Sequence, residues 1–301
     1  SNDRTKLIRT LEDQAQVFGA YPFNKVHRFE MGGAVSRYSY RLDRISNYYE
    51  NINGYPGYYI TSDKRKVPLS EATNDIGVPL KSFSIFQANA SFVGDNSING
   101  ITSPLDGFRY RVGVEQYFGD YQFSAVTVDL RKYWRLKPIT IAARSYNYQR
   151  IGKDGENLYP LYVGYPYLIR GYEANSLYNT RNSSANGFDI NQLSGNKIAV
   201  FNFELRLPFT GPKKLSAIPS KFLFTDLNLF FDAGLAWNED SKVVFKNQPT
   251  NAKERVPAMS VGMSLRVNVF GYFVLEPYYA IPFQRTDLTL GVFGLTFAPG
   301  W

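Results

Sequence analysis

The sequence predicts an all-β fold, specifically a transmembrane antiparallel up-and-down β-barrel. Three observations carry this prediction. Strand-length segments alternate between apolar and polar residues, charges are confined to the polar face, and long and short connections follow one another along the chain. Ten strands are visible, at residues 26–41, 82–94, 107–118, 121–134, 138–149, 197–209, 222–237, 258–270, 272–283 and 288–298. They reach the roughly 9–11 residues that a tilted membrane strand requires.

The alternation is clearest at 258–270. One face carries Met259, Val261, Met263, Leu265, Val267 and Val269, and the other carries Ser260, Gly262, Ser264, Arg266 and Asn268. The stretches 108–116, 125–131, 200–209 and 226–237 divide in the same way, with charges on the polar face only. A charge on a lipid-facing surface at mid-membrane costs about 2–4 kcal/mol, whereas a water-soluble sandwich is under no such constraint. The pattern therefore favours a membrane barrel over a sandwich.

Composition excludes several classes of protein. The mean hydropathy of the 301 residues is −0.30, and no apolar run approaches the roughly 20 residues of a spanning helix. Cysteine is absent and His27 is the single histidine, which excludes most zinc sites and catalytic triads. The acidic residues stand among opposite charges rather than as an isolated pair. We therefore expect no catalytic residues, no metal and no cofactor, and we do not expect an enzyme.

The net charge of +8 does not indicate nucleic-acid binding, because lysine and arginine are scattered singly through predicted strands and loops. Residues 1–22 are predicted as a short helical or irregular segment, since Leu7, Leu11 and Phe18 fit one helical face. The barrel is expected to occupy residues 23–301.

The connections set an expected orientation. Short turns are predicted at 135–138 and 270–272, and long loops at 42–81, 150–196 and 238–257. Outer-membrane barrels have short periplasmic turns and long external loops, which places the 150–196 loop outside and the C-terminus in the periplasm. The connections at 95–106 and 210–221 are longer than this rule predicts.

One loop carries an arginine inside an apolar and aromatic stretch, GYPYLIRGYE at 164–173. The alternation at 222–237 places Asp232 on the polar face, inside the barrel. The family resemblance of these two segments, given next, implies that the Asp232 carboxylate accepts two parallel hydrogen bonds from the Arg170 guanidinium. We expect this pair to hold the loop like a latch, either as a structural brace or as a functional element. Glu204, Arg206, Arg266 and Glu276 are expected to extend the network on neighbouring strands.

These segments resemble a known family. The run IRGY, which is Ile169, Arg170, Gly171 and Tyr172, resembles the loop motif of the BamA/TamA outer-membrane assembly superfamily, the bacterial surface antigen family. FFDAG, from Phe230 to Gly234, resembles its companion motif two strands later, and five predicted strands follow the loop, as in that family. The resemblance implies that the 150–196 loop folds back into the barrel lumen. The final strand, with Phe297 and the terminal Trp301, resembles the sorting signal of bacterial outer-membrane barrels.

The resemblance also implies a function. Proteins of this superfamily assemble, insert or translocate other proteins at the outer membrane of Gram-negative bacteria, and some carry a periplasmic propeller before the barrel. Their barrels have sixteen strands and ten are visible here, so we expect this chain to be the C-terminal part of such a barrel, the alternative being a smaller barrel. The implied partners are outer-membrane lipids, lipopolysaccharide, client outer-membrane proteins, and periplasmic or lipoprotein partners, but no nucleic acid. The alternatives are a passive or gated channel lined by Arg109, Arg111 and Arg131, or a barrel that anchors a fused secreted or displayed domain.

Overall fold

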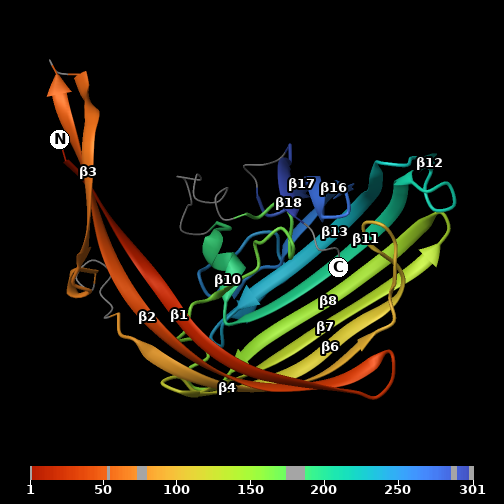
Figure 1. The fold of residues 1–301 in the computed structure, drawn as a ribbon, viewed down its shortest axis with the longest axis horizontal. Coiled ribbons are helices and arrows are strands. Elements are labelled where there is room, and N and C mark those ends of the chain that lie inside the picture. Colours follow the sequence, from red (N-terminus) through yellow and green to blue (C-terminus); the bar gives the residue numbers. More distant parts are fainter. Residues whose placement is uncertain (1, 53–54, 73–79, 174–186, 286–289, 298–301) are drawn as a thin grey trace. The chain divides into compact units, whose positions relative to one another are not determined.

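The computed structural model describes residues 2–52, 55–72, 80–173, 187–285 and 290–297 (Figure 1), and it is built almost entirely from antiparallel strands. The long strands are β1 (Asn2–Pro22), β2 (His27–Ile52), β3 (Tyr55–Val67), β4 (Phe83–Asp95), β6 (Pro104–Gly119), β7 (Phe123–Leu136), β8 (Ile139–Ile151), β11 (Lys197–Gly211), β13 (Phe224–Trp237), β16 (Ala258–Val269), β17 (Phe273–Pro282) and β18 (Val292–Phe297).

The remaining elements are short and lie in the connections. They are β5 (Ile98–Asn99), β9 (Leu161–Tyr162), β10 (Ser194–Gly195), β12 (Ile218–Pro219), β14 (Lys242–Val243), β15 (Glu254–Arg255) and the 3₁₀ helix η1 (Ile190–Leu193). None of the helices in the described residues has the length and hydropathy needed to cross a membrane.

The chain divides into two compact units. The first comprises Ser1–Phe18, Gly32–Ala88 and Tyr117–Tyr121, and the second comprises Gly19–Met31, Asn89–Gln116 and Gln122–Trp301. The candidate site lies wholly in the second unit.

The first unit corrects two predictions. Residues 2–22 form the strand β1, which pairs with β2, and not a helical or irregular segment. The apolar spacing of Leu7, Leu11 and Phe18 fits a helix, but hydrogen bonding to a neighbouring strand overrides a weak local preference. The predicted loop at 42–81 is also largely a hairpin, because β2 continues to Ile52 and β3 returns along it, with Leu42 opposite Val67. The Asn-Gly dipeptide at 53–54 is a hairpin signal that the loop prediction overlooked.

From β4 onward the strand order is β4, β6, β7, β8, β11, β13, β16, β17 and β18, each strand hydrogen-bonded to the next. Figure 1 shows β6, β7, β8, β11 and β13 lying side by side. All ten predicted strands overlap observed ones, and the up-and-down order is confirmed. The strand order begins at β1 and ends at β18, and these two are not paired within the described residues, so closure into a barrel stays a prediction.

The two faces of the sheet have the reverse of the usual polarity. The apolar face is open: Met263 and Leu229 are each 51% exposed, although both lie in the middle of long strands. The polar face is covered, and Glu204 and Asp232 on it are 0% exposed. A water-soluble sheet would bury the first face and expose the second. The apolar face is therefore the one that meets a nonpolar solvent.

Candidate functional site

A segment of the 150–196 loop covers the polar face. Leu168, Ile169 and Tyr172 are buried in a core that the loop forms with strands of the sheet, hereafter the wall. The wall contributes Ile198 and Val200 from β11, Ala236 from β13 and Ala258 from β16, and the loop adds Val163 and Leu193. The described residues of this loop therefore pack on the polar face of the sheet, and its entry into a closed lumen stays a prediction.

The local backbone presents Arg170 to the wall. The amides of Leu168 and Ile169 both donate to the Tyr165 carbonyl, at 2.8 and 2.9 Å, which closes one helical turn. The chain then bends at Gly171, whose φ of 92° is in the region that favours glycine. A Cβ at Gly171 would also stand 3.2 Å from the Cβ of Ala280 on β17, so the close approach to the wall leaves little room for a side chain.

Arg170 binds Asp232 in the predicted bidentate manner. Its Nε donates to Asp232 Oδ2 at 2.7 Å and its Nη2 to Asp232 Oδ1 at 2.8 Å, while the backbone amide of Arg170 adds a contact of 3.2 Å to Oδ2. Asn202 on β11 joins loop and wall as well, because its Nδ2 donates to the Leu168 carbonyl at 2.7 Å and to Asp232 Oδ1 at 2.8 Å. Asp232 and Asn202 face each other in the pairing of β13 with β11.

The same guanidinium reaches two further carboxylates. Arg170 Nη2 lies 2.9 Å from Glu204 Oε1 on β11, and Nη1 lies 3.0 Å from Glu276 Oε1 on β17. Its planar face lies 3.6 Å from the centre of the Phe230 ring. All three carboxylates come from different wall strands, so one loop side chain ties β11, β13 and β17 together.

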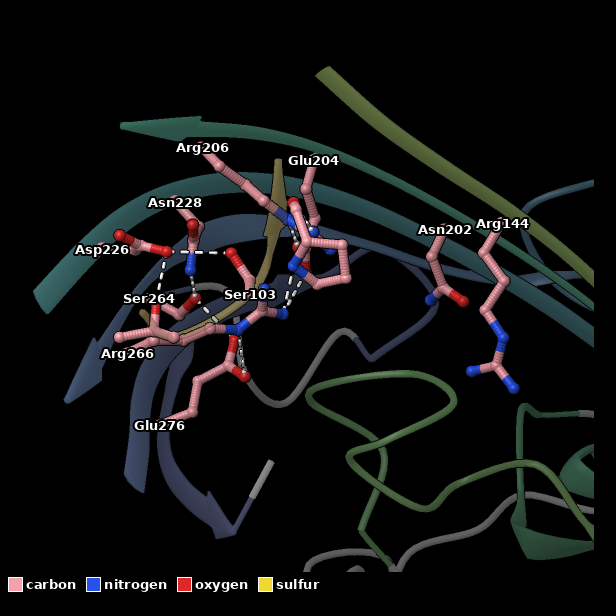
Figure 2. Close-up of polar contacts among 12 residues, drawn as sticks. Ser103, Arg144, Asn202, Glu204, Arg206, Asp226, Asn228, Ser264, Arg266 and Glu276 are labelled. Carbon is pink, nitrogen blue, oxygen red and sulfur yellow. Dashed lines mark hydrogen bonds and ion pairs between the residues drawn. The ribbon is translucent and has the colours of Figure 1, made fainter. Parts of the chain in front are cut away.

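Two wall arginines complete the cluster. Arg206 donates to Glu204 at 2.8 Å, and Arg266 lies 3.0 Å from both Glu204 Oε2 and Glu276 Oε2. Figure 2 shows Glu204 between these two arginines, with Glu276 on the other side of Arg266 and Ser264 beside it. The predicted extension of the network is therefore present.

The cluster, hereafter the clamp, consists of Arg170, Glu204, Arg206, Asp232, Arg266 and Glu276. Three cations face three anions, and every member is at most 3% exposed. Burying an unpaired charge is prohibitively unfavourable, whereas a balanced and hydrogen-bonded set offsets much of its desolvation. Burial alone lowers the pKa of Arg170, but the carboxylates of Asp232 and Glu204 raise it more, and its net pKa lies above the usual range.

Two glycines of the sheet leave room for neighbouring side chains, one in the loop and one on the sheet itself. A Cβ at Gly234 would come within 2.8 Å of Ile169 Cγ1, and one at Gly262 would come within 2.6 Å of the Phe230 ring. Gly262 and Phe230 face each other in the pairing of β16 with β13. Of the predicted acceptor residues beside Asp232, Gly234 therefore leaves room for the Ile169 side chain, and Phe230 packs its ring against the Arg170 guanidinium.

Tyr172 lies near the end of the loop segment at residues 165–173, hereafter the latch. Its hydroxyl donates toward the Met259 carbonyl at 2.8 Å and toward Gln284 Oε1 at 2.6 Å, and Ile169, Gly171 and Tyr172 all contact the wall directly. Burial raises the pKa of Tyr172 to about 12. Neither Gln284 nor Asn202 is predicted as a site residue, since Asn202 has no pattern that separates it from any other polar-face residue of its strand and Gln284 lies in a turn after β17.

A second inward segment was not predicted. The hydroxyl groups of Thr102 and Ser103 both donate to the Asp226 carboxylate of β13, the latter at 2.8 Å, and Asn268 donates to the Ile101 carbonyl at 3.0 Å. Arg206 of the clamp also donates to the Pro104 carbonyl at 3.3 Å. The unexpected length of the 95–106 connection, noted in the sequence, is therefore accounted for: it reaches the polar face.

The remaining predicted residues lie elsewhere. Phe297 is on β18 and is exposed, whereas Trp301 lies outside the described residues. His27, the single histidine, is hydrogen-bonded through Nδ1 to the Tyr110 hydroxyl at 2.7 Å and is stacked on Phe92. Within the described residues, no group of histidines and carboxylates is arranged to hold a metal ion.

Fold and site together define a class: a membrane β-sheet protein of the outer-membrane barrel type, with a loop clamped onto its polar face. Residues 8–297 match the family model of the Omp85 superfamily domain. The chain belongs to the Omp85 superfamily.

Among solved structures, CdiB from Acinetobacter baumannii is similar in fold, with a TM-score of 0.51 and 11% sequence identity. The match covers 93% of this chain and 39% of that one, so the chain spans well under half of that neighbour's length. A search of the curated proteins finds no match.

Proposed function

We propose that this chain is part of an outer-membrane transporter that assembles, inserts or translocates other polypeptides, the role expected from its resemblance to the BamA/TamA proteins. Residues 165–173 act in it as a releasable latch. Membership of the Omp85 superfamily supports the general class. The observation that carries the latch is the clamp, in which one loop guanidinium binds carboxylates on three wall strands.

The chemistry of the clamp favours a latch over a simple brace. Well-packed apolar residues of similar volume often stabilise a protein as well as a buried ion network does, or better. Ionic contacts instead fix one register of the loop on the wall. They can also re-form with the same partners after the loop has been displaced. A wall that binds and releases a loop can open a path for a polypeptide without losing its own strand pairing.

The absence of cysteine allows a direct test, because a disulfide can be introduced without background thiols. Ile169 and Gly234 are the sites of choice, since a Cβ at Gly234 would come within 2.8 Å of Ile169 Cγ1 and two cysteine Cβ atoms there fall in the range of a disulfide. The double variant Ile169→Cys/Gly234→Cys is reconstituted in liposomes and given a labelled outer-membrane client. We expect the oxidised form to be inactive in client insertion or translocation, and reductant to restore activity.

The outcomes separate the parts of the proposal. Equal activity of the oxidised and reduced forms would show that the segment is a permanent brace. If the unmodified protein conducts ions steadily but processes no client, the channel alternative replaces the transporter. The Ile169→Cys single variant is the matched control, because oxidation cannot lock it.

A further inference from the structure

A second cluster of charges lies on the polar face, away from the clamp. It surrounds a cavity of about 220 Å³ that is lined by Arg28 of β2, Arg109 and Arg111 of β6, and Arg131 of β7, together with Asp95 and Asp129. The cavity belongs entirely to the second structural unit. Guanidiniums from three strands thus surround one space.

The carboxylates near this cavity are shared between arginines. Glu30 bonds both Arg28, at 2.6 Å, and Arg111, at 2.5 Å. Asp129 bonds both Arg131, at 2.6 Å, and Arg144, at 3.3 Å. Asp95 pairs with a single arginine, Arg109, at 2.7 Å, and also accepts hydrogen bonds from Ser97. Five guanidiniums therefore face three carboxylates, an excess of two positive charges, whereas the clamp is balanced.

The two clusters also differ in access to solvent. The side chains of Arg28, Arg109, Arg111 and Arg131 are 23–45% exposed, compared with 4% for Arg170. A guanidinium has five N–H donors, and the described carboxylate contacts of Arg28 and Arg109 are made through Nε. Their remaining donors stand beside an open cavity that a solute can enter.

We propose that this cavity binds a phosphate group. A phosphate monoester carries about −1.5 to −2 charges at neutral pH, which matches the excess of two positive charges. Its tetrahedral oxygens accept hydrogen bonds from several directions, as guanidiniums arriving from three strands require. A planar carboxylate is satisfied by the fork of a single arginine. The chemistry is shared by free inorganic phosphate and by a phosphate carried on a larger molecule such as a lipid or sugar headgroup.

Calorimetric titration of inorganic phosphate into the detergent-solubilised protein, in phosphate-free buffer of low salt, tests the site. We expect saturable binding that Arg109→Gln weakens about tenfold or more, since it removes charge-assisted hydrogen bonds. Asp95→Asn removes the carboxylate that competes for Arg109 and should tighten binding, so the two variants shift affinity in opposite directions. Arg135→Gln is the matched control, because Arg135 is on β7, the strand next to that of Arg109, but donates to Thr140 and does not line the cavity.

Three results would overturn the site: no saturable binding, the same loss in Arg135→Gln as in Arg109→Gln, or acetate binding as tightly as phosphate. Titration with glycerol phosphate identifies the source. Binding equal to that of inorganic phosphate supports a phosphate carried on a larger molecule, and binding of the free ion alone supports a site for inorganic phosphate. Neither result depends on client transport.

Discussion

Arg170 is the residue through which the loop is attached to the wall. Each carboxylate that it binds lies on a different strand. Its planar fork fits Asp232 at two points, which a lysine ammonium cannot reproduce.

Arg170→Ala should destabilise the folded protein by about 3–5 kcal/mol, because it leaves three buried carboxylates against two arginines. The readout is the temperature at which the folded form is lost on a heat-modifiability gel. The neighbouring Lys153, which is exposed in the same loop, provides the control Lys153→Ala. Arg170→Ala/Glu276→Gln restores charge balance and should recover part of the loss. An Arg170→Ala variant as heat-resistant as the control would contradict the buried clamp.

Tyr172 should make the loop sensitive to alkali. Its pKa is raised to about 12 by burial, above the value of about 10 in an unfolded chain. The neutral phenol is favoured in the folded state, so its stabilising contribution is complete below about pH 10 and is lost as the pH rises toward 12. Between about pH 9 and 11.5, the heat resistance of the wild type should fall more steeply than that of Tyr172→Phe, which has no proton to lose. Parallel pH profiles would exclude Tyr172 as a contributor.

At the scale of elements, the clamp stands between two inward segments. The latch contributes Arg170 to the clamp, and the segment at 101–104 contacts the clamp through the Pro104 carbonyl, which accepts a hydrogen bond from Arg206. Glu204 touches both arginines, so the two segments share one carboxylate. The 95–106 connection is thus long because it has an anchor to reach.

Asp226→Ala should release the 101–104 segment, since Thr102 and Ser103 both lose their acceptor. We expect new cleavage between residues 96 and 106 in limited proteolysis of the folded protein, with the strands intact. Asp240→Ala, at an exposed loop position, serves as the control. Cleavage that is unchanged from wild type would mean that the segment is held by other contacts.

Gly234→Ala tests the packing of the latch on β13. The added Cβ meets the Ile169 side chain, and overpacking of this kind costs about 1–3 kcal/mol. The variant should expose the loop to protease, and Ile169→Ala in the same chain should relieve the clash and restore resistance. If the double variant is as sensitive as Gly234→Ala, the steric explanation is wrong.

At the scale of the whole molecule, the sheet buries its polar face and exposes its apolar face, the reverse of a water-soluble sheet. Charges are collected on the covered face, and large apolar side chains stay exposed on the other. Hydrogen bonding between successive strands satisfies the backbone of the inner strands, as a sheet in lipid requires, and the two edge strands β1 and β18 would need closure to meet the same condition. The family assignment agrees with this arrangement.

Met263→Arg should therefore impair folding into lipid vesicles. Met263 is central in β16 and on the apolar face, where an arginine at mid-membrane costs about 2–4 kcal/mol. Phe245→Arg is the control, because Phe245 lies in a loop and is 89% exposed. The measurement is the folded fraction on a gel after dilution from urea into vesicles. Equal folded fractions for both variants would argue that the apolar face does not contact lipid.

Much of the site followed from the sequence. The period of two assigns Glu204, Arg206, Asp232 and Arg266 to the polar face, because alternate side chains of a strand point to opposite sides. Resemblance to a family motif then placed Arg170 against Asp232. The local pattern failed where pairing with another strand decided the outcome. Residues 2–22 and 55–67 became strands because β2 offered them unsatisfied backbone groups.

The sequence by itself determined the faces of the strands and their number after the loop, since both depend on local periodicity and order, and the resemblance of two of its motifs to a known family implied the pairing of Arg170 with Asp232. Only the tertiary structure decided that Arg170 also binds Glu204 and Glu276, that Thr102 and Ser103 reach Asp226, and that the arginines around Arg109 outnumber their carboxylates. The contacts of Arg170 with Glu276 and of Ser103 with Asp226 join residues 106 and 123 positions apart, and they depend on strand register and loop folding, which no local pattern encodes.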